Sequence, residues 1–330
     1  MPARIITVAS LFTSCLITAA MGTGCSGRSP SSAEAEKRSA APALSKEQAQ
    51  QVLDSYAAGA NRLRLKVDRR ALAAIEAEPQ LSMDEASLKL RRVIKRPPPE
   101  VKFMNTSFYI PRVSGYPRWF AAATVTGQGK RSVRHALLFT QDKAGTPWLL
   151  TANPYPTSDA LGNVALDSEG YATPVDADER EGLATAPGTL PEAHAALLTD
   201  GPGAPKASLL ADGAQTSETY KALKQGEKSL AGRGVTLSSR FSPTQYRVFA
   251  LRTKDRGALV WYVIKQNEAY SSAKRGRLAV GGDLLGLAPV KAARTRMDTT
   301  VLVQYLAAVP PKGRATVTGM YRKAVTAHGT

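Results

Sequence analysis

The sequence predicts an α+β fold of two similar domains, each with N-terminal helices packed on a curved antiparallel sheet. Apolar residues recur at helical spacing from residue 45 and at alternating spacing from residue 101, which indicates helices followed by strands. The same order returns after residue 180. Helices that precede an antiparallel sheet are typical of the α+β class. We therefore expect a first domain at residues 45–180 and a second at residues 181–330.

Three helices are expected to open the first domain. Ser45 and Gln48 form a capping-box pattern, and an apolar stripe follows at helical spacing. The stripe consists of Ala49, Val52, Leu53, Tyr56, Ala60, Leu63 and Val67. Asp68 can cap a second, short helix that ends near Pro79. The pattern SMDE at 82–85 repeats the capping signal and predicts that a third helix begins there.

Antiparallel strands are expected to follow the helices in both halves. In the second half, Thr189 and Glu192 predict a capped helix, and residues 217–230 form another helical pattern. Runs rich in β-branched and aromatic residues, separated by turn residues, predict the strands. These strands are 116–125, 132–140 and 146–152 in the first half and 245–253, 257–265, 299–309 and 314–325 in the second.

The two halves share a short sequence match. YPRWFAAAT at 116–124 matches QYRVFALRT at 245–253 in four of nine positions. The matched pairs are Arg118 with Arg247, Phe120 with Phe249, Ala121 with Ala250 and Thr124 with Thr253. Together with the repeated order of elements, the match suggests a duplication, although a match of this length also arises by chance.

Two irregular segments interrupt this pattern. Residues 153–188 are rich in Pro, Gly, Ser and acidic residues, and form either a linker or a loop packed over the first sheet. Residues 271–296 carry two basic clusters, and form either a binding loop or a solvated excursion.

The N-terminus has the layout of a secretory signal. Arg4 is followed by an uncharged, apolar run of small residues, so we expect residues 1–24 to be a signal peptide. Cys15 lies within this run, and its removal would leave Cys25 as the single cysteine of an exported chain without an internal disulfide. Residues 25–44 combine Ser, Ala and mixed charges, which predicts a flexible tether.

The sequence GTGC at 22–25 resembles a bacterial lipobox, in which small residues precede a cysteine that receives a diacylglyceryl group. It departs from the usual motif at Gly22, where Leu, Val or Ile is common. The resemblance implies that Cys25 is lipidated and anchors the protein at the outer face of the cell membrane, because two acyl chains give stable anchoring. Cleavage with release, and an uncleaved span formed by residues 5–27, are the alternatives.

Helices followed by a curled antiparallel sheet are similar to the nuclear-transport-factor-2-like, or cystatin-like, cone fold. The signal, the lipobox, the Ala-rich tether and the two similar halves together resemble uncharacterised secreted lipoproteins of actinobacteria. This resemblance implies a location and tandem cone-like domains, and it implies no catalytic residues.

A strong positive charge narrows the range of partners. The chain has 44 Lys and Arg against 27 Asp and Glu, a net charge of +17 at pH 7. Such a balance attracts anionic partners. Because the signal predicts export, we expect an anionic membrane or cell-wall polymer surface, or an unidentified protein, and no nucleic acid. A general effect on solubility is the alternative explanation of the charge.

One histidine suggests a pocket. His135 shares an expected strand face with Leu137 and Phe139, where it is the one titratable group among apolar residues. It is therefore the best candidate for a general base in an apolar pocket, and a satisfied core histidine is the alternative. We name His135, Trp119 and Phe139 as pocket candidates.

No catalytic or cofactor motif accompanies these residues. His194 lies on an expected helix and His328 in a tail expected to be loose, so the histidines are not paired. The absence of CxxC, HExxH, GxSxG and P-loop patterns predicts that the protein uses neither a metal nor a cofactor. We expect a non-catalytic binding or cell-envelope interaction module. A small-molecule carrier or an isomerase-like or hydrolase-like enzyme that uses His135 is the alternative.

Overall fold

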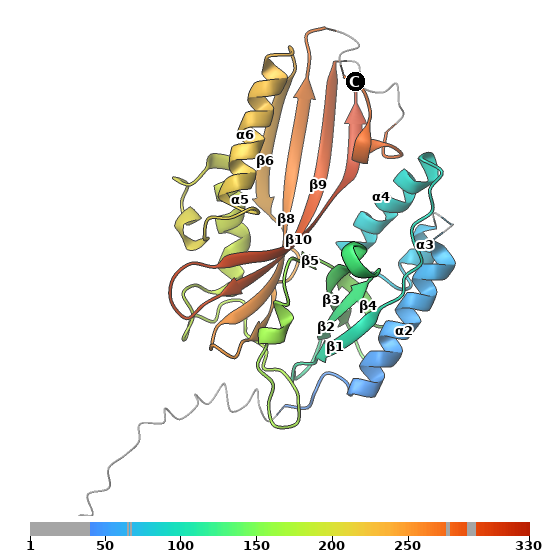
Figure 1. The fold of residues 1–330 in the computed structure, drawn as a ribbon, viewed down its shortest axis with the longest axis vertical. Helices are drawn as coiled ribbons and strands as arrows, with labels where there is room; N and C mark the ends of the chain where they lie inside the picture. Colours follow the sequence, from blue (N-terminus) through green and yellow to red (C-terminus); the bar gives the residue numbers. More distant parts are fainter. Residues whose placement is uncertain (1–39, 65, 67, 275–277, 289–294) are drawn as a thin grey trace, which may run out of the picture.

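Two antiparallel sheets form the framework of the chain (Figure 1). The computed structural model describes residues 40–64, 66, 68–274, 278–288 and 295–330. Within these residues the sheets have four and six strands, and helices lead into the strands of both halves. The α+β class with antiparallel sheets is therefore confirmed.

Three helices open the described chain. They are α2 (Lys46–Leu63), α3 (Arg69–Leu72) and α4 (Gln80–Val93). The predicted capping box is present, because Gln48 N donates to Ser45 Oγ (3.2 Å) and Ser45 N donates to Gln48 Oε1 (2.8 Å). Asp68 caps α3 as predicted, by accepting from two backbone amides. The local polar signals at these two helix starts therefore determine where the helices begin.

The start of α4 differs from the expectation. The helix begins at Gln80, directly after Pro79, so Ser82 lies inside it rather than at its cap. The Ser82 hydroxyl donates to Glu78 Oε1 (2.8 Å) and is not the cap that would accept from the backbone amides of the motif SMDE. Proline is favoured at helix starts because it has no amide hydrogen to leave unpaired, and here it sets the boundary.

Packed structure begins before the first helix, at residues that the sequence assigns to the tether. Ala43 and Leu44 are buried, and Ala43 N donates to Pro111 O (2.9 Å). Leu44 directly precedes the capping residue and shares a hydrophobic cluster with Ala49, which is the arrangement of a hydrophobic staple.

The first sheet is buried on both faces. Its strands, in spatial order, are β1 (Met104–Tyr109), β2 (Arg118–Thr126), β3 (Val133–Gln141) and β4 (Leu149–Ala152). Along β2, Phe120 packs with α2, whereas Trp119 and Ala121 belong to the cluster on the opposite face. Side chains alternate between the faces of a strand, so the continuous apolar run of β2 fits a sheet covered on both sides.

The second sheet carries helices on its outer face. Its strands are β5 (Tyr155–Pro156), β10 (Thr316–Gly329), β9 (Arg296–Val309), β8 (Ala258–Ser271) and β6 (Thr236–Pro243) in spatial order, with β7 (Phe249–Arg252) paired to β8. Its helices are α5 (Leu190–Asp200) and α6 (Ser217–Ala231). Leu190 and Leu197 of α5 pack on Tyr262 and Tyr305 of the sheet. α5 and α6 lie on the opposite side of the molecule from α2 to α4 in Figure 1.

A shared core joins the two sheets. Trp119 and Leu138 of the first sheet pack in one cluster with Phe249, Trp261 and Leu306 of the second. The indole nitrogen of Trp261 donates to Ala136 O at 3.1 Å, which fixes the two sheets against each other. The layers are therefore α2, first sheet, second sheet and α5. The division into two similar cone-like domains stays a prediction.

The segment 153–188 packs against this core, as one of the two expected alternatives proposed. Leu161 and Val164 are buried in the cluster between the sheets. Its first residues form β5, which pairs with β10 and so adds a strand from the first half of the chain to the second sheet. The segment therefore holds both halves together rather than separating them.

The second half differs from the expectation at one helix cap, one additional strand and the C-terminal strand. Thr189 precedes α5, but its side chain makes no capping hydrogen bond. The strand β6 is absent from the expected list, because TLSSRFSP has no clear alternation of apolar residues. β10 runs to Gly329 and pairs His328 with Asp298, so His328 lies in a strand rather than in a loose tail.

The two strands of the sequence match occupy different positions. β2 lies between β1 and β3, whereas β7 pairs with β8. Phe120 packs toward α2, and Phe249 packs against Trp119 with ring centroids 5.2 Å apart. The duplication stays a prediction.

Candidate functional site

A cavity of about 590 Å³ lies where the helices meet both sheets. Its walls come from α2, α4, the segment 97–103, the start of β3 and β5. The apolar lining consists of Ala60, Leu63, Leu72, Leu88, Pro98, Pro99, Val101, Phe103 and Val133. Ligand sites are commonly apolar hollows with a few polar groups, and the wall of this cavity also carries polar groups.

Two buried carboxyl groups, Glu76 and Asp84, lie in the wall of the cavity. Glu76 is only 2% exposed, and its backbone forms a bridge with Leu150 of β4. Its Oε1 accepts from the Tyr56 hydroxyl (3.2 Å), whereas its buried Oε2 accepts from no donor of the protein. The Glu76 and Asp84 side chains are also hydrogen-bonded to each other, which requires that the two carboxyl groups share a proton. Asp84 projects from α4 and also lines the cavity. Burial disfavours the charged form of both groups, so this carboxyl pair is the exceptional feature of the site.

Asp84, in contrast, is well partnered. Gln80 Nε2 donates to Asp84 Oδ2 (2.9 Å) and the Tyr321 hydroxyl donates to Asp84 Oδ1 (3.3 Å). Tyr321 lies on β10, and its hydroxyl is also 3.2 Å from Ser87 Oγ. The carboxylate of α4 is therefore held by donors from its own helix and from the second sheet.

The environment of the pair favours its protonated form. Burial raises the pKa of Glu76 well above its usual range, and the neighbouring Asp84 raises this pKa further. Burial also raises the pKa of Asp84, while hydrogen bonds from Gln80, Glu76 and Tyr321 act in the opposite direction. Glu76 therefore keeps its proton to a higher pH than Asp84 does.

A buried network connects α4 to the second sheet behind the carboxyl groups. Gln304 Nε2 of β9 donates to Gln80 Oε1 (3.0 Å), and Gln304 Oε1 accepts from Asn153 N (2.7 Å). Because Gln80 in turn donates to Asp84, the position of this carboxylate depends on residues of both sheets. Fully paired buried networks of this kind restrict side chains to one arrangement.

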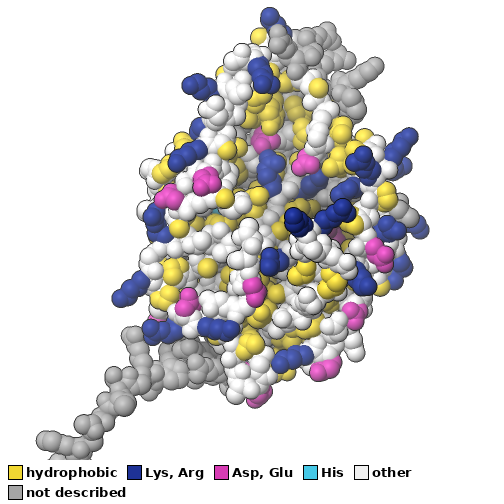
Figure 2. Space-filling view, in the orientation of Figure 1, with side chains coloured by type: hydrophobic (Ala, Val, Ile, Leu, Met, Phe, Trp, Pro, Cys, Tyr) yellow, Lys and Arg dark blue, Asp and Glu magenta, His cyan; other side chains and the backbone are white. Residues whose placement is uncertain are grey.

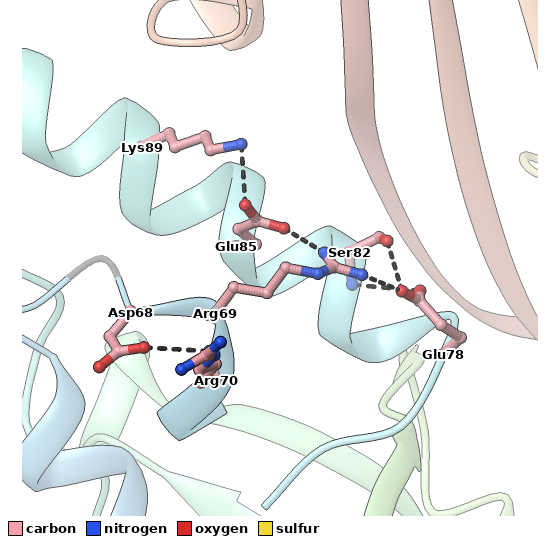
Figure 3. Close-up of polar contacts among 7 residues, drawn as sticks. All are labelled: Asp68, Arg69, Arg70, Glu78, Ser82, Glu85 and Lys89. Carbon is pink, nitrogen blue, oxygen red and sulfur yellow. Dashed lines mark hydrogen bonds and ion pairs between the residues drawn. The ribbon is translucent and has the colours of Figure 1, made fainter. Parts of the chain in front are cut away.

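An ion-pair network joins α3, Glu78 and α4 around the turn that carries Glu76 (Figure 3). Arg69 of α3 pairs with Glu78 (2.9 Å) and with Glu85 of α4. Lys89 pairs with Glu85 at 2.9 Å, and Ser82 donates to Glu78. These contacts connect the short helix α3 to α4 on either side of the turn that carries Glu76. Exposed pairs are individually weak, so their effect here is to position the turn rather than to stabilise the fold strongly.

His135 lines the same cavity, and both of its ring nitrogens are hydrogen-bonded. Its Nδ1 is 3.0 Å from Asn153 Oδ1, which can only accept, so Nδ1 donates. Its Nε2 then accepts from the Thr126 hydroxyl (2.8 Å). Burial lowers the pKa of His135, which keeps the imidazole neutral. The ring packs edge-on against Tyr155, with ring centroids 5.2 Å apart.

The other predicted pocket residues lie elsewhere. Phe139 is fully buried behind the cavity wall, where its ring packs against Tyr56 with ring centroids 5.7 Å apart. Trp119 lies on the opposite face of the first sheet, in the core between the sheets. Cys25 lies outside the described residues. Of the predicted residues, the structure therefore brings only His135 to this cavity.

Sequence reasoning missed the carboxyl pair and the tyrosines around it. Glu76 follows an apolar run, and Asp84 lies one helical turn after the buried Gln80. An acidic residue on the buried side of a helix is a signal that could have identified Asp84. Tyr155 and Tyr321 gave no signal, because their neighbourhood arises only when β5 and β10 pair.

A second buried histidine has a structural role. His194 of α5 is fully buried, with Nδ1 2.8 Å from the Tyr262 hydroxyl and Nε2 2.8 Å from Gln215 O. The carbonyl accepts from Nε2, so Nδ1 accepts from the tyrosine. Burial lowers the pKa of His194 to about 4. With both nitrogens satisfied, this histidine holds α5 to the sheet.

The described residues contain no cluster of three or more His, Cys, Asp or Glu side chains that could hold a metal ion. Among the helices that the structure describes, none combines the length and apolar character needed to cross a bilayer.

The chain is similar to lipoproteins of Streptomyces. It is 28% identical over 319 residues to an uncharacterized lipoprotein of Streptomyces coelicolor, covering 91% of this chain and 87% of the relative. An uncharacterized lipoprotein of Streptomyces avermitilis is 32% identical over 187 residues, covering 54% of this chain and 52% of the relative. No solved structure matches the chain significantly. The family described as Domain of unknown function (DUF8094) matches residues 40–329, and the chain therefore belongs to this family.

Proposed function

We propose that the protein is a lipid-anchored, extracytoplasmic binding protein that holds a small organic molecule in the cavity beside Glu76. The observation that carries the proposal is the buried carboxyl pair of Glu76 and Asp84 in the wall of an apolar hollow, where Glu76 Oε2 accepts from no donor of the protein. A ligand that donates hydrogen bonds to this pair would stabilise carboxylates that burial disfavours. The apolar walls would supply the remaining contact area.

The geometry of His135 supports a binding role over a catalytic one. A general base needs a free lone pair within reach of the proton that it removes. The Nε2 lone pair of His135 accepts from Thr126, and its Nδ1 proton is donated to Asn153. The imidazole therefore acts as a fixed part of the wall.

The lipid anchor is supported by GTGC at 22–25 and by the printed names of the Streptomyces relatives. Metabolic labelling with a fatty acid is expected to mark the wild-type chain and to leave Cys25→Ala unlabelled, because the thioether forms on this sulfur. Equal labelling of both chains would refute lipidation at Cys25.

Blocking the mouth of the cavity is expected to abolish binding in it. Val133 lines the cavity and is 41% exposed, so Val133→Trp fills the entrance with little effect on the core. We expect the neutral dye N-phenyl-1-naphthylamine to fluoresce on binding to the wild type and to lose most of this signal with Val133→Trp. Val93→Trp is the matched control, because Val93 is 47% exposed on α4 and does not line the cavity. An equal signal from all three proteins would contradict binding in this cavity.

A basic surface at the end of α4 supports a second function, attachment to anionic surfaces. Arg64, Lys66, Arg91, Arg92, Lys95 and Arg96 surround one hollow there. Val93 and Ile94, 47% and 39% exposed, lie among these cations. Lys and Arg are spread over the face shown in Figure 2, with several over the region of α4. Exposed apolar residues among cations favour a membrane surface with anionic headgroups.

Removing four cations from this surface is expected to weaken binding to phosphatidylglycerol vesicles by roughly 100- to 1,000-fold, since each contributes about 1 kcal/mol near an anionic surface. The variant replaces Arg91, Arg92, Lys95 and Arg96 by Gln, and the control replaces the exposed Lys221, Lys228, Arg240 and Lys312. Co-sedimentation should also decrease with added salt. Equal loss in both variants would show that net charge, and not this surface, is responsible.

A further inference from the structure

We infer that the cavity selects an organic amine, whose ammonium group donates to the Glu76 and Asp84 carboxylates while its hydrocarbon part lies against the apolar wall. This inference rests on the proposed binding function and names its ligand class.

The carboxyl pair has no cationic partner among the described side chains. No Lys or Arg among the described residues forms an ion pair with Glu76 or Asp84. Lys323 is the neighbouring cation on β10, but its Nζ pairs with Asp283 at 3.4 Å. A ligand cation would therefore supply the counter-charge that the protein itself does not place there. An ammonium group has three donors and no acceptor, which matches two carboxylates in one site.

The proton shared by the two carboxyl groups decides where the cation would bind. Glu76 is 2% exposed and lines the cavity, its Oε2 accepts from no donor of the protein, and its side chain is hydrogen-bonded to Asp84. Tyr56 donates to the other Glu76 oxygen, and Asp84 also accepts from Gln80 and Tyr321. An ammonium group would replace the shared proton and donate to both carboxylates.

Aromatic rings around the carboxyl groups favour the same ligand. Tyr56 stacks with Phe103 at 6.3 Å between ring centroids, and Tyr155 lies 5.1 Å from Tyr321. Phe103 also packs edge-on against His135. Aromatic faces attract cations through their quadrupole, most strongly where water is excluded. Aromatic and acidic groups thus act on one cation together.

Two arginines line the outer part of the cavity and argue against a purely acidic site. Arg64 Nη1 donates to Pro98 O (3.3 Å), and Arg131 is exposed. Exposed charges are screened by salt over about 10 Å at 0.1 M, whereas the buried carboxyl groups are screened much less. The arginines would therefore slow the entry of a cation more than they would weaken its binding at the inner end.

Binding of an amine is expected to release a proton from the pair. Burial raises the pKa of Glu76, and a bound ammonium group would lower this pKa by stabilising the carboxylate. Affinity should therefore increase as pH rises through the raised pKa. The other titratable or charged groups that face the pair or line the cavity are Tyr56, Arg64, Glu78, Glu100, Arg131, His135, Tyr155, Tyr321 and Lys323.

The test compares three probes of equal length, hexylamine, 1-hexanol and hexanoate, by isothermal titration calorimetry of the purified full-length protein at pH 7.5. A hydrogen bond between charged groups is about twice as strong as a neutral one, so we expect hexylamine to bind at least about tenfold more tightly than either other probe. Titration in buffers of different ionisation enthalpy should reveal the released proton. Glu76→Gln, which keeps the shape of the side chain, is expected to remove both the preference and the proton release.

Two further variants complete the test. Asp84→Asn should also reduce the preference for the amine, whereas Glu100→Gln, at the outer part of the cavity, should retain it. Loss of the preference only in Glu100→Gln would overturn the assignment to the inner end. Binding of hexanol or hexanoate without hexylamine would overturn the amine while leaving the proposed function intact. Binding of none of the probes would overturn the amine, and the Val133→Trp dye experiment would then decide the proposed function separately.

Discussion

Trp261→Ala is expected to lower the free energy of unfolding by about 3–5 kcal/mol, the range for removing a large aromatic side chain from a core. Trp261 is 2% exposed on β8, and it packs with residues of both sheets. Its indole also donates to Ala136 O of the first sheet, and the substitution would leave this carbonyl without that partner. Urea unfolding followed by circular dichroism measures the loss.

The same substitution tests whether the two halves unfold together. A core shared by both sheets predicts one transition in the wild type and one transition at lower urea concentration in Trp261→Ala. Trp261→Phe is the control, because it keeps an aromatic ring in the core and loses the hydrogen bond and the smaller part of the ring volume, so a smaller decrease is expected. Two separate transitions, with only one shifted by Trp261→Ala, would show instead that the halves are independent domains.

Acid is expected to destabilise the protein through His194 by about 3 kcal/mol between pH 6.5 and pH 4, since one pKa unit corresponds to about 1.4 kcal/mol. The folded pKa is lowered from 6.5 to about 4 by burial. Below pH 6.5 the unfolded chain binds the proton more readily than the folded chain does. The stability contribution is therefore fully present above pH 6.5 and is lost as the pH falls toward 4.

Comparison with His194→Gln isolates this contribution. A glutamine can accept from the Tyr262 hydroxyl and donate to Gln215 O, as the neutral imidazole does, but it does not titrate. The raised pKa values of Glu76 and Asp84 act in the opposite direction in the acidic range, and they are common to both proteins. The difference in unfolding free energy between the two proteins should change with pH. A constant difference from pH 7 to pH 4 would contradict the role of His194.

The fold class was accessible from the sequence because its signals are local. The capping box of Ser45 and Gln48 and the Asp68 cap depend on residues within one helical turn. The apolar strands β2, β3, β8 and β9 are identified by composition and by the turns between them. The polar edge strand β6 was missed because its hydrogen bonds to β8, and not its own pattern, make it a strand. The similarity to Streptomyces lipoproteins agrees with the resemblance to actinobacterial lipoproteins that the sequence predicts. The cone-like fold stays a prediction.

Most of the candidate site could not be predicted from the sequence, because its contacts are not local. His135 could be selected because it is a polar residue on an apolar strand face, and it does line the cavity. The carboxyl groups acquire their properties from partners that are remote in sequence. Asp84 and Tyr321, for example, are separated by 237 positions, and no periodicity within either segment indicates their contact.

This separation also determines when the site can form during synthesis of the chain. Tyr321 belongs to β10, the final strand, which also holds β5 at the edge of the second sheet. Long-range pairings are made late, because the intervening chain must first be ordered. A nascent chain that has formed α2 to α6 but not β10 still lacks one donor to Asp84 and the strand that pairs with β5. Binding at this site would therefore require that β10 has been synthesised and has paired with β5.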